Sequence, residues 1–283
     1  MTDLRVLADG FTMLESGRWY EGRLWVAHWA SGEILAIDLD GGVERMAPGP
    51  DGYGWSFDWL PDGRRLTTGP TLTVSTVDGS GEPYGHLPDV ASHGWNELVV
   101  TASGDVYVNG FEFDLANGGA PQPGIIALVR ADGATSVVAG DLQFPNGMAL
   151  TPDGRTLLVS ESFAGQITAF DIGADGTLDN RRVWADGVGP DGICIDADGA
   201  VWCGAGDIRM LGGGPDAPGG AALRVVEGGQ VTRRVEFDRP GFSYALGGPH
   251  DRTLFALTTE WRGLDSIDAT AAERTGRVLA IEL

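Results

Sequence analysis

Four polar side chains that carry oxygen atoms stand at nearly the same distance before a turn glycine. Asn96, Asn146 and Asp191 each lie eight residues before such a glycine, and Glu15 lies seven residues before another. Carboxylate and amide oxygens are the ligands that hard divalent cations prefer. Carboxylates that meet in a protein interior are costly to desolvate unless a cation neutralises them. If the fold brings these positions together, they would form a site for a divalent metal ion.

The same residues also have an ordinary explanation, because Asn-Gly and Asp-Gly pairs are common in turns. Asn146 and Asp191 are each followed by glycine, so either of them could simply mark a turn. Their shared phase with Glu15 and Asn96 favours a common site over coincidence.

The elements that must position these residues recur six times along the chain, each time as a short apolar strand, a tight turn and further strands. The turns are Glu21-Gly22, Asp62-Gly63, Ser103-Gly104, Asp153-Gly154, Asp198-Gly199 and His250-Asp251, at a spacing of roughly 40 to 53 residues. Four-stranded units at this period are typical of propeller blades. The pattern predicts an all-β fold, a six-bladed β-propeller with a metal site on the central axis, as one domain over residues 1–283. Residues 276–281 should pair with residues 4–7 to close the ring.

Equivalent positions in a propeller are related by its pseudo-symmetry axis, so their side chains should converge at one end of the central channel. Trp55 takes the corresponding place in the second unit, and Tyr244 lies near it in the sixth. His28 and Glu161 end second strands, which run back to the same face. We therefore expect these four residues, with Asn96, to bind substrate at this mouth. A core aromatic or a structural histidine is the plain alternative for each.

Three long irregular stretches also follow second strands, at residues 111–123, 212–220 and 262–275. Long loops over a polar site commonly shape a substrate pocket. We expect them to ring the same mouth.

The composition excludes several classes of function. The net charge is -21, which argues against nucleic acid or an anionic membrane as a partner. All 19 basic residues are arginine, and a chain without lysine can form neither a Schiff base nor a P-loop. The serines near the mouth stand in no nucleophile-elbow sequence. We expect a small-molecule lactone or ester as the partner, and a monomer or small homo-oligomer.

The start of the chain and the cysteines bear on the compartment. No basic segment followed by an apolar one comes after Met1, and no stretch is long enough to span a bilayer, which predicts a cytoplasmic location. Cys194 and Cys203 could face each other across a hairpin, so a bridge is conceivable. Two buried free thiols are the expectation.

Four segments carry a family likeness: LESGRWYEGRLWVAHWASGEILAID, HGWNELVV, FPNGMALTPDGRTLLVSESF and GPDGICIDADGAVW. They resemble the senescence marker protein (regucalcin), gluconolactonase and luciferin-regenerating enzyme family in order and in spacing, over essentially the whole chain. The resemblance implies a six-bladed propeller with one catalytic divalent ion, usually calcium and sometimes zinc. It also implies hydrolysis of sugar lactones or related esters.

The resemblance assigns roles by motif. Glu15 of LESGRW, Asn146 of FPNGM and Asp191 of GPDGI match the family's metal ligands. Asn96 of GWNE matches a residue that contacts the substrate or the metal.

Three positions depart from the family pattern, and they bear on the substrate. The family often has arginine where this chain has Gly94, and aspartate where it has Glu97 or His28. The arginine binds sugar hydroxyls in the family. Aromatic residues are expected around the mouth, namely Trp19, Trp55, Phe111, Phe163 and Tyr244. We therefore expect a pocket more apolar than that of a strict sugar lactonase.

Together these observations predict a metal-dependent hydrolase that opens a lactone, as a gluconolactonase does, or a small ester. Asp191 is the expected general base toward water, with nucleophilic attack by its carboxylate left open, and Asn96 is expected to orient the substrate. Ca²⁺ is the expected ion, and Zn²⁺, Mg²⁺ or Mn²⁺ could substitute. The alternatives are a non-catalytic propeller that binds calcium or a small molecule, and a phosphorus-ester hydrolase on the same fold.

Overall fold

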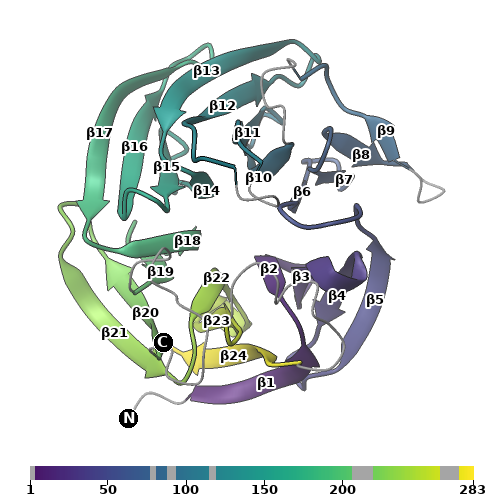
Figure 1. The fold of residues 1–283 in the computed structure, drawn as a ribbon, viewed down its shortest axis with the longest axis vertical. Helices are drawn as coiled ribbons and strands as arrows, with labels where there is room; N and C mark the ends of the chain where they lie inside the picture. Colours follow the sequence, from purple (N-terminus) through teal and green to yellow (C-terminus); the bar gives the residue numbers. More distant parts are fainter. Residues whose placement is uncertain (1–3, 77–80, 88–93, 115–118, 206–218, 262–273) are drawn as a thin grey trace.

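The computed structural model describes residues 4–76, 81–87, 94–114, 119–205, 219–261 and 274–283. Its strands form six four-stranded antiparallel sheets, arranged as blades around a central axis (Figure 1). This confirms the all-β six-bladed propeller predicted from the repeat. The loop regions expected at residues 212–220 and 262–275 lie largely outside the described residues.

The strands are named here from the axis outward. The innermost strands are β2 (Leu14–Tyr20), β6 (Phe57–Trp59), β10 (Trp95–Val100), β14 (Pro145–Leu150), β18 (Gly189–Ile195) and β22 (Gly241–Gly247). The second strands are β3 (Arg23–His28), β7 (Arg65–Thr67), β11 (Val106–Gly110), β15 (Thr156–Glu161), β19 (Val201–Gly204) and β23 (Thr253–Thr258). The third strands are β4 (Glu33–Ile37), β8 (Thr73–Ser75), β12 (Gly124–Val129), β16 (Gln166–Ile172), β20 (Gly220–Val225) and β24 (Gly276–Glu282). The outer strands are β5 (Val43–Pro48), β9 (Gly81–Pro83), β13 (Thr135–Leu142), β17 (Leu178–Asp186), β21 (Val231–Phe237) and β1 (Leu4–Phe11), and two short 3-10 turns are η1 (Trp29–Ser31) and η3 (Pro249–Asp251).

The turn glycines of the sequence repeat fix the hairpins between first and second strands. Between β14 and β15, the N–H of Gly154 donates to the carbonyl of Thr151 at 2.7 Å, and Gly154 has a φ of 68°. An L side chain rarely adopts this left-handed conformation, so glycine is the residue that allows the turn. The position of this glycine in turn sets where β14 begins.

The ring is closed by strands from opposite ends of the sequence. The N-terminal strand β1 forms the outer edge of the last blade by pairing with β24, and Leu4 lies opposite Ile281 (Figure 1). The predicted pairing of residues 276–281 with the chain start is therefore confirmed. Closure leaves no blade without its full set of four strands.

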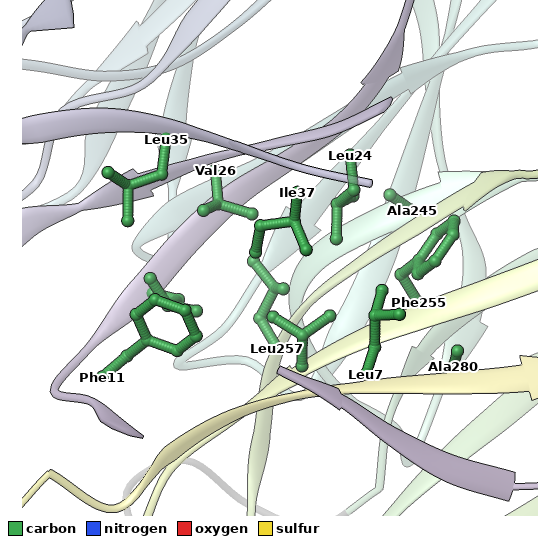
Figure 2. Packing of buried hydrophobic residues seen from close by; sticks show 12 residues of the cluster. Leu7, Phe11, Leu24, Val26, Leu35, Ile37, Ala245, Phe255, Leu257 and Ala280 are labelled. Atoms are coloured by element: carbon green, nitrogen blue, oxygen red, sulfur yellow. The ribbon is translucent and has the colours of Figure 1, made fainter. Parts of the chain in front are cut away.

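The hydrophobic core lies between neighbouring blades. Successive side chains of a strand point to opposite faces, so β3 serves two interfaces. Leu24 and Val26 belong to the cluster shared with the last blade, where Phe255 lies (Figure 2). Trp25 belongs to the cluster on the other face, which is shared with the second blade. Because both faces of the second and third strands are largely covered, these strands read as nearly continuous apolar runs, whereas the outer strands are largely exposed.

Two further expectations concern the cysteines and the membrane. Cys194 and Cys203 are both free thiols, as expected. Burial raises the pKa of the Cys203 thiol to about 12, which keeps it protonated. Among the described residues, no helix has the length and apolar character needed to cross a bilayer.

Candidate functional site

The innermost strands are irregular where the predicted ligands stand. Shifts of register fall at residues 15–18 of β2, 95–98 of β10, 145–148 of β14 and 189–194 of β18. In each bulge more residues lie on the inner strand than on its partner, so side chains are turned out of the regular alternation. Asn96, Asn146 and Asp191 lie within these bulges, and Glu15 lies at the edge of the bulge in β2. The bulges turn these side chains toward the interior of the ring.

The structure brings these four residues within reach of one another. Glu15, Asn96 and Asp191 are buried, with 4–5% of their surface exposed, and Asn146 is half-buried. The side-chain amide of Asn96 donates to Oδ1 of Asn146 at 3.5 Å. Burial and then the nearby charge of Asp191 raise the pKa of Glu15 well above its usual value. Burial and then the charge of Glu97 raise the pKa of Asp191 to about 8.

The two carboxylates are poorly satisfied by protein donors. Oδ1 of Asp191 is buried without a hydrogen-bond partner among the described residues. The hydrogen bond recorded for the Glu15 carboxylate comes from the backbone N–H of the next residue, Ser16, at 3.2 Å. Buried oxygen atoms left without donors are costly. This donor set fits a hard divalent cation, which would supply the missing partner.

The site differs from a dense cluster of acidic or histidine ligands. The described part of the chain holds no group of three or more His, Cys, Asp and Glu side chains that could bind a metal. Two carboxylates, from Glu15 and Asp191, would instead be completed by the amide oxygen of Asn146. Amide oxygens are ordinary ligands of calcium.

Four residues next to the predicted ligands were missed as site residues by sequence reasoning. Glu97 is buried, and its carboxylate accepts hydrogen bonds from Ser16 Oγ at 2.7 Å and Arg18 Nη2 at 2.8 Å. Asn109 on β11 accepts from the N–H of Glu97 at 3.2 Å and donates to the carbonyl of Asn146 at 2.6 Å. Among these four residues, only Glu97 had a signal in the sequence, because it departs from the family pattern. The contacts that join it to Ser16, Arg18 and Asn109 link different strands.

Two of the predicted substrate contacts belong to the core instead. Trp55 is fully buried in the cluster between the first two blades, and its indole N–H donates to the carbonyl of Gly52 at 3.2 Å. Tyr244 is fully buried between the last two blades, and its hydroxyl donates to the carbonyl of Ala221 at 3.3 Å. Their phase along the repeat is that of the ligands, but their side chains point between the blades. We correct both assignments to core residues.

His28 has partners on both ring nitrogens. Nε2 lies 2.9 Å from Thr12 Oγ1, and Nδ1 lies 2.7 Å from Ser31 Oγ. The ring also meets Phe11 edge to face, with centroids 5.8 Å apart. Burial lowers the pKa of His28, so the ring is neutral near pH 7. These contacts correspond to the structural histidine that was the plain alternative.

Glu161, the fourth predicted substrate contact, is held within its own blade. Its carboxylate accepts hydrogen bonds from the backbone N–H of Gln143 at 2.7 Å, from Gln166 Nε2 at 3.0 Å and from Thr168 Oγ1. Arg181 adds an ion pair at 3.1 Å. With both oxygens engaged by the protein, Glu161 has a structural role.

An aromatic cluster stands beside Asn146. Phe111, Phe113, Phe144 and Phe163 contact one another, and the rings of Phe144 and Phe163 stack at 4.4 Å. Phe144 has a φ of 58°, a conformation that bulky residues rarely adopt and that tends to occur at functional sites. The ring of Phe111 lies near Gly54, which leads into the second blade. Apolar side chains therefore flank the polar residues on the side of the third and fourth blades.

A comparison with family models finds one match. The model of the SMP-30/gluconolactonase/LRE-like region matches residues 59–260, which is more than half of the chain.

Comparisons with individual proteins find relatives of the same kind. A 6-deoxy-6-sulfogluconolactonase of Pseudomonas putida is 30% identical over 142 residues, which is 48% of this chain and 45% of that protein. The match thus spans less than half of the length of this curated relative. A gluconolactonase structure from Xanthomonas campestris has a TM-score of 0.75 at 22% identity, covering 100% of this chain and 89% of the other. A calcium-binding regucalcin from Agrobacterium tumefaciens has a TM-score of 0.74 at 20% identity, covering 99% and 95%. At these identities the two structures support the fold.

Proposed function

The chain belongs to the SMP-30/gluconolactonase/LRE-like family, and on this premise we propose that it is a metal-dependent hydrolase that opens a lactone or small ester. The observation that carries the proposal is the buried Oδ1 of Asp191, which has no hydrogen-bond partner among the described residues. Two amide side chains, Asn96 and Asn146, lie in the same site. A carboxylate with a free oxygen and a nearby amide donor can accept a proton from water and hold a carbonyl group.

Glu15, Asn146 and Asp191 are the residues we propose as ligands of the ion. Their oxygens favour Ca²⁺, with Mg²⁺, Mn²⁺ or Zn²⁺ as substitutes in an assay. When bound, a divalent ion polarises the substrate carbonyl as a Lewis acid and stabilises the negative charge that develops on its oxygen.

The reaction itself is assigned to two side chains. Nδ2 of Asn96 is a donor that can orient the lactone through one of its oxygens. The carboxylate of Asp191, through the oxygen that does not bind the ion, takes the proton of the water that attacks the carbonyl carbon. As the ring C–O bond breaks, the same atom returns that proton to the leaving alkoxide, so the enzyme ends in its starting state. Attack by the Asp191 carboxylate itself, followed by hydrolysis of the acyl intermediate, is the alternative route.

The proposed substrate is less polar than an unsubstituted sugar lactone. The Phe111, Phe113, Phe144 and Phe163 cluster lies beside Asn146, and Gly94 offers no side chain to bind sugar hydroxyls.

A second function rests on one observation. The regucalcin from Agrobacterium is described as a calcium-binding protein, and the same carboxylates would serve a propeller that binds calcium without catalysis.

The test is a pH-indicator screen of aldonolactones, aliphatic lactones and aryl esters, with and without a chelator. We expect hydrolysis that chelation abolishes and that added Ca²⁺ restores. Activity that ignores chelation would remove the metal from the proposal. A protein that binds Ca²⁺ and hydrolyses none of these compounds would instead support the binding function.

A further inference from the structure

Arg18 occupies the central channel next to the predicted ligands. Its Nη2 donates to Glu97 Oε2 at 2.8 Å and to the carbonyl of Leu98 at 3.2 Å, and its Nη1 donates to the carbonyl of Gly17 at 3.1 Å. Arg18 is on β2 of the first blade and Glu97 on β10 of the third, with the second blade between them (Figure 1). A bond between blades that are not neighbours must cross the channel.

Polar groups on two other blades lie near the same guanidinium. The guanidinium of Arg18 interacts electrostatically with Asp58 of the second blade and with Cys194 of the fifth. The side chain of Glu97 is 4% exposed and that of Arg18 is 21% exposed, so water screens the pair weakly. Arg18 is therefore a cation on the axis, surrounded by several blades.

The contacts of Glu97 connect Arg18 to the ligands. Arg18 holds one oxygen of Glu97, and the other accepts the hydroxyl of Ser16 at 2.7 Å. Ser16 stands in the bulge of β2 with a φ of 54°, and its N–H donates to Glu15 at 3.2 Å. A continuous chain of hydrogen bonds therefore leads from Arg18 to Glu15.

Arg18 reduces the negative charge of the site. Glu15, Glu97 and Asp191 are the buried carboxylates that act on one another, and Arg18 is the cation paired with them. Asp58, which also faces Arg18 and Glu97, brings the formal count to four negative charges and one positive charge, so Arg18 reduces the negative charge around a bound ion by one unit. Without the guanidinium, the surroundings would gain one unit of negative charge, which favours a trivalent ion more than a divalent one.

We propose that Arg18 is a positioning residue that holds Glu97 and Ser16 beside Glu15 and, through its charge, lowers the affinity of the site for a trivalent cation relative to a divalent one. The inference rests on the proposed metal site and goes beyond it, since it concerns which charge the site selects.

The experiment measures binding of Ca²⁺ and La³⁺ to metal-free protein by calorimetry, in wild type and in Arg18→Met. Removing one unit charge a few ångström from the ion should raise the ratio of La³⁺ to Ca²⁺ affinity by about tenfold. Arg18→Lys keeps the charge and loses the forked contacts, so it should weaken both ions and leave the ratio near that of wild type.

Two further variants make the test independent of the folding of Arg18→Met. Glu97→Gln removes a negative charge and should lower the ratio by about tenfold, and the double variant with Arg18→Met should restore it. Arg181→Met is the matched control, because the partners of Arg181 are Glu161, Gly140 and Asp141 and not the ligand residues, and its ratio should not change.

The outcomes separate the two proposals. Both variants, Arg18→Met and Glu97→Gln, could bind both ions with the same ratio of La³⁺ to Ca²⁺ affinity as wild type. That result would overturn the role of Arg18 and leave the metal site standing. Wild-type protein that binds neither ion would overturn the metal site and this inference with it.

Discussion

Asp191 and Glu161 are two buried carboxylates that lie in neighbouring blades and have opposite surroundings. Glu161 accepts hydrogen bonds from Gln143, Gln166 and Thr168 and an ion pair from Arg181. Asp191 has an oxygen without any donor among the described residues. Burial alone therefore does not distinguish a structural carboxylate from a functional one. The difference lies in whether the protein itself satisfies the oxygens.

The largest expected effect is on catalysis. Asp191→Asn should lower turnover of the preferred lactone by about two to four decades, the usual size for loss of a general base. Initial rates at saturating substrate measure this, and single turnover in ¹⁸O-labelled water identifies the route. Label that enters only the product supports the general base, whereas label in the Asp191 carboxylate supports direct attack. Glu161→Gln is the matched variant, which should keep near wild-type turnover. A loss of turnover as large as that of Asp191→Asn would contradict the comparison.

Metal removal should affect the stability of the site that contains Asp191. At an ion concentration of one hundred times Kd, binding stabilises the folded state by about 2.7 kcal/mol, so a chelator should lower the unfolding midpoint accordingly. Thermal unfolding with and without chelator measures it. In Asp191→Asn the shift should be smaller, and in Glu161→Gln it should match that of wild type. Equal shifts in all three proteins would contradict Asp191 as a ligand.

Truncation at Glu161 should act on folding. Glu161→Ala leaves the N–H of Gln143 and the hydroxyl of Thr168 without their acceptor, at a cost of about 1–3 kcal/mol in the free energy of unfolding. Asp191→Asn replaces a carboxyl group whose ionised form is disfavoured by burial and by the charge of Glu97, so it should not destabilise the metal-free protein. Urea unfolding of the metal-free variants compares them. A greater loss of stability in Asp191→Asn would invert the roles of the two residues.

The smallest effect is expected on substrate preference. Phe163 is partly buried against the aromatic cluster beside Asn146, and Phe163→Ala should raise KM for an alkyl-substituted lactone by about three- to tenfold. Gluconolactone should be nearly unaffected because it offers little apolar surface. Steady-state kinetics on both substrates decides, with Val183→Ala, an exposed position on β17, as control. A wild-type preference for gluconolactone over less polar lactones would refute the proposed pocket.

The repeat made most of the fold predictable. Turn glycines that need a positive φ mark the hairpins, and the apolar first and last segments indicated that Leu4 would meet the C-terminal strand. Because the glycine spacing also sets the start of each inner strand, it brought Asn96, Asn146 and Asp191 into one phase. These features are local in sequence, so a single chain reveals them.

The orientation of side chains was not predictable in the same way. Trp55 shares the phase of the ligands and still packs between blades, since it precedes β6, whose pairing begins at Phe57. The pairing of Arg18 with Glu97 joins blades that are distant in sequence. Neither the bulges nor contacts across the channel leave a periodic signal.

The closure of the ring by β1 has a consequence for synthesis of the chain on the ribosome. The strand that completes the last blade emerges first, and its partner β24 emerges last. Until then, β1 has an unpaired edge, and Leu7 and Phe11 lack the apolar neighbours that the last blade supplies in the finished protein. Such an edge can pair with another nascent chain. The growing polypeptide therefore carries an aggregation-prone segment until β24 has been made, and a product that ends before β24 would keep it exposed.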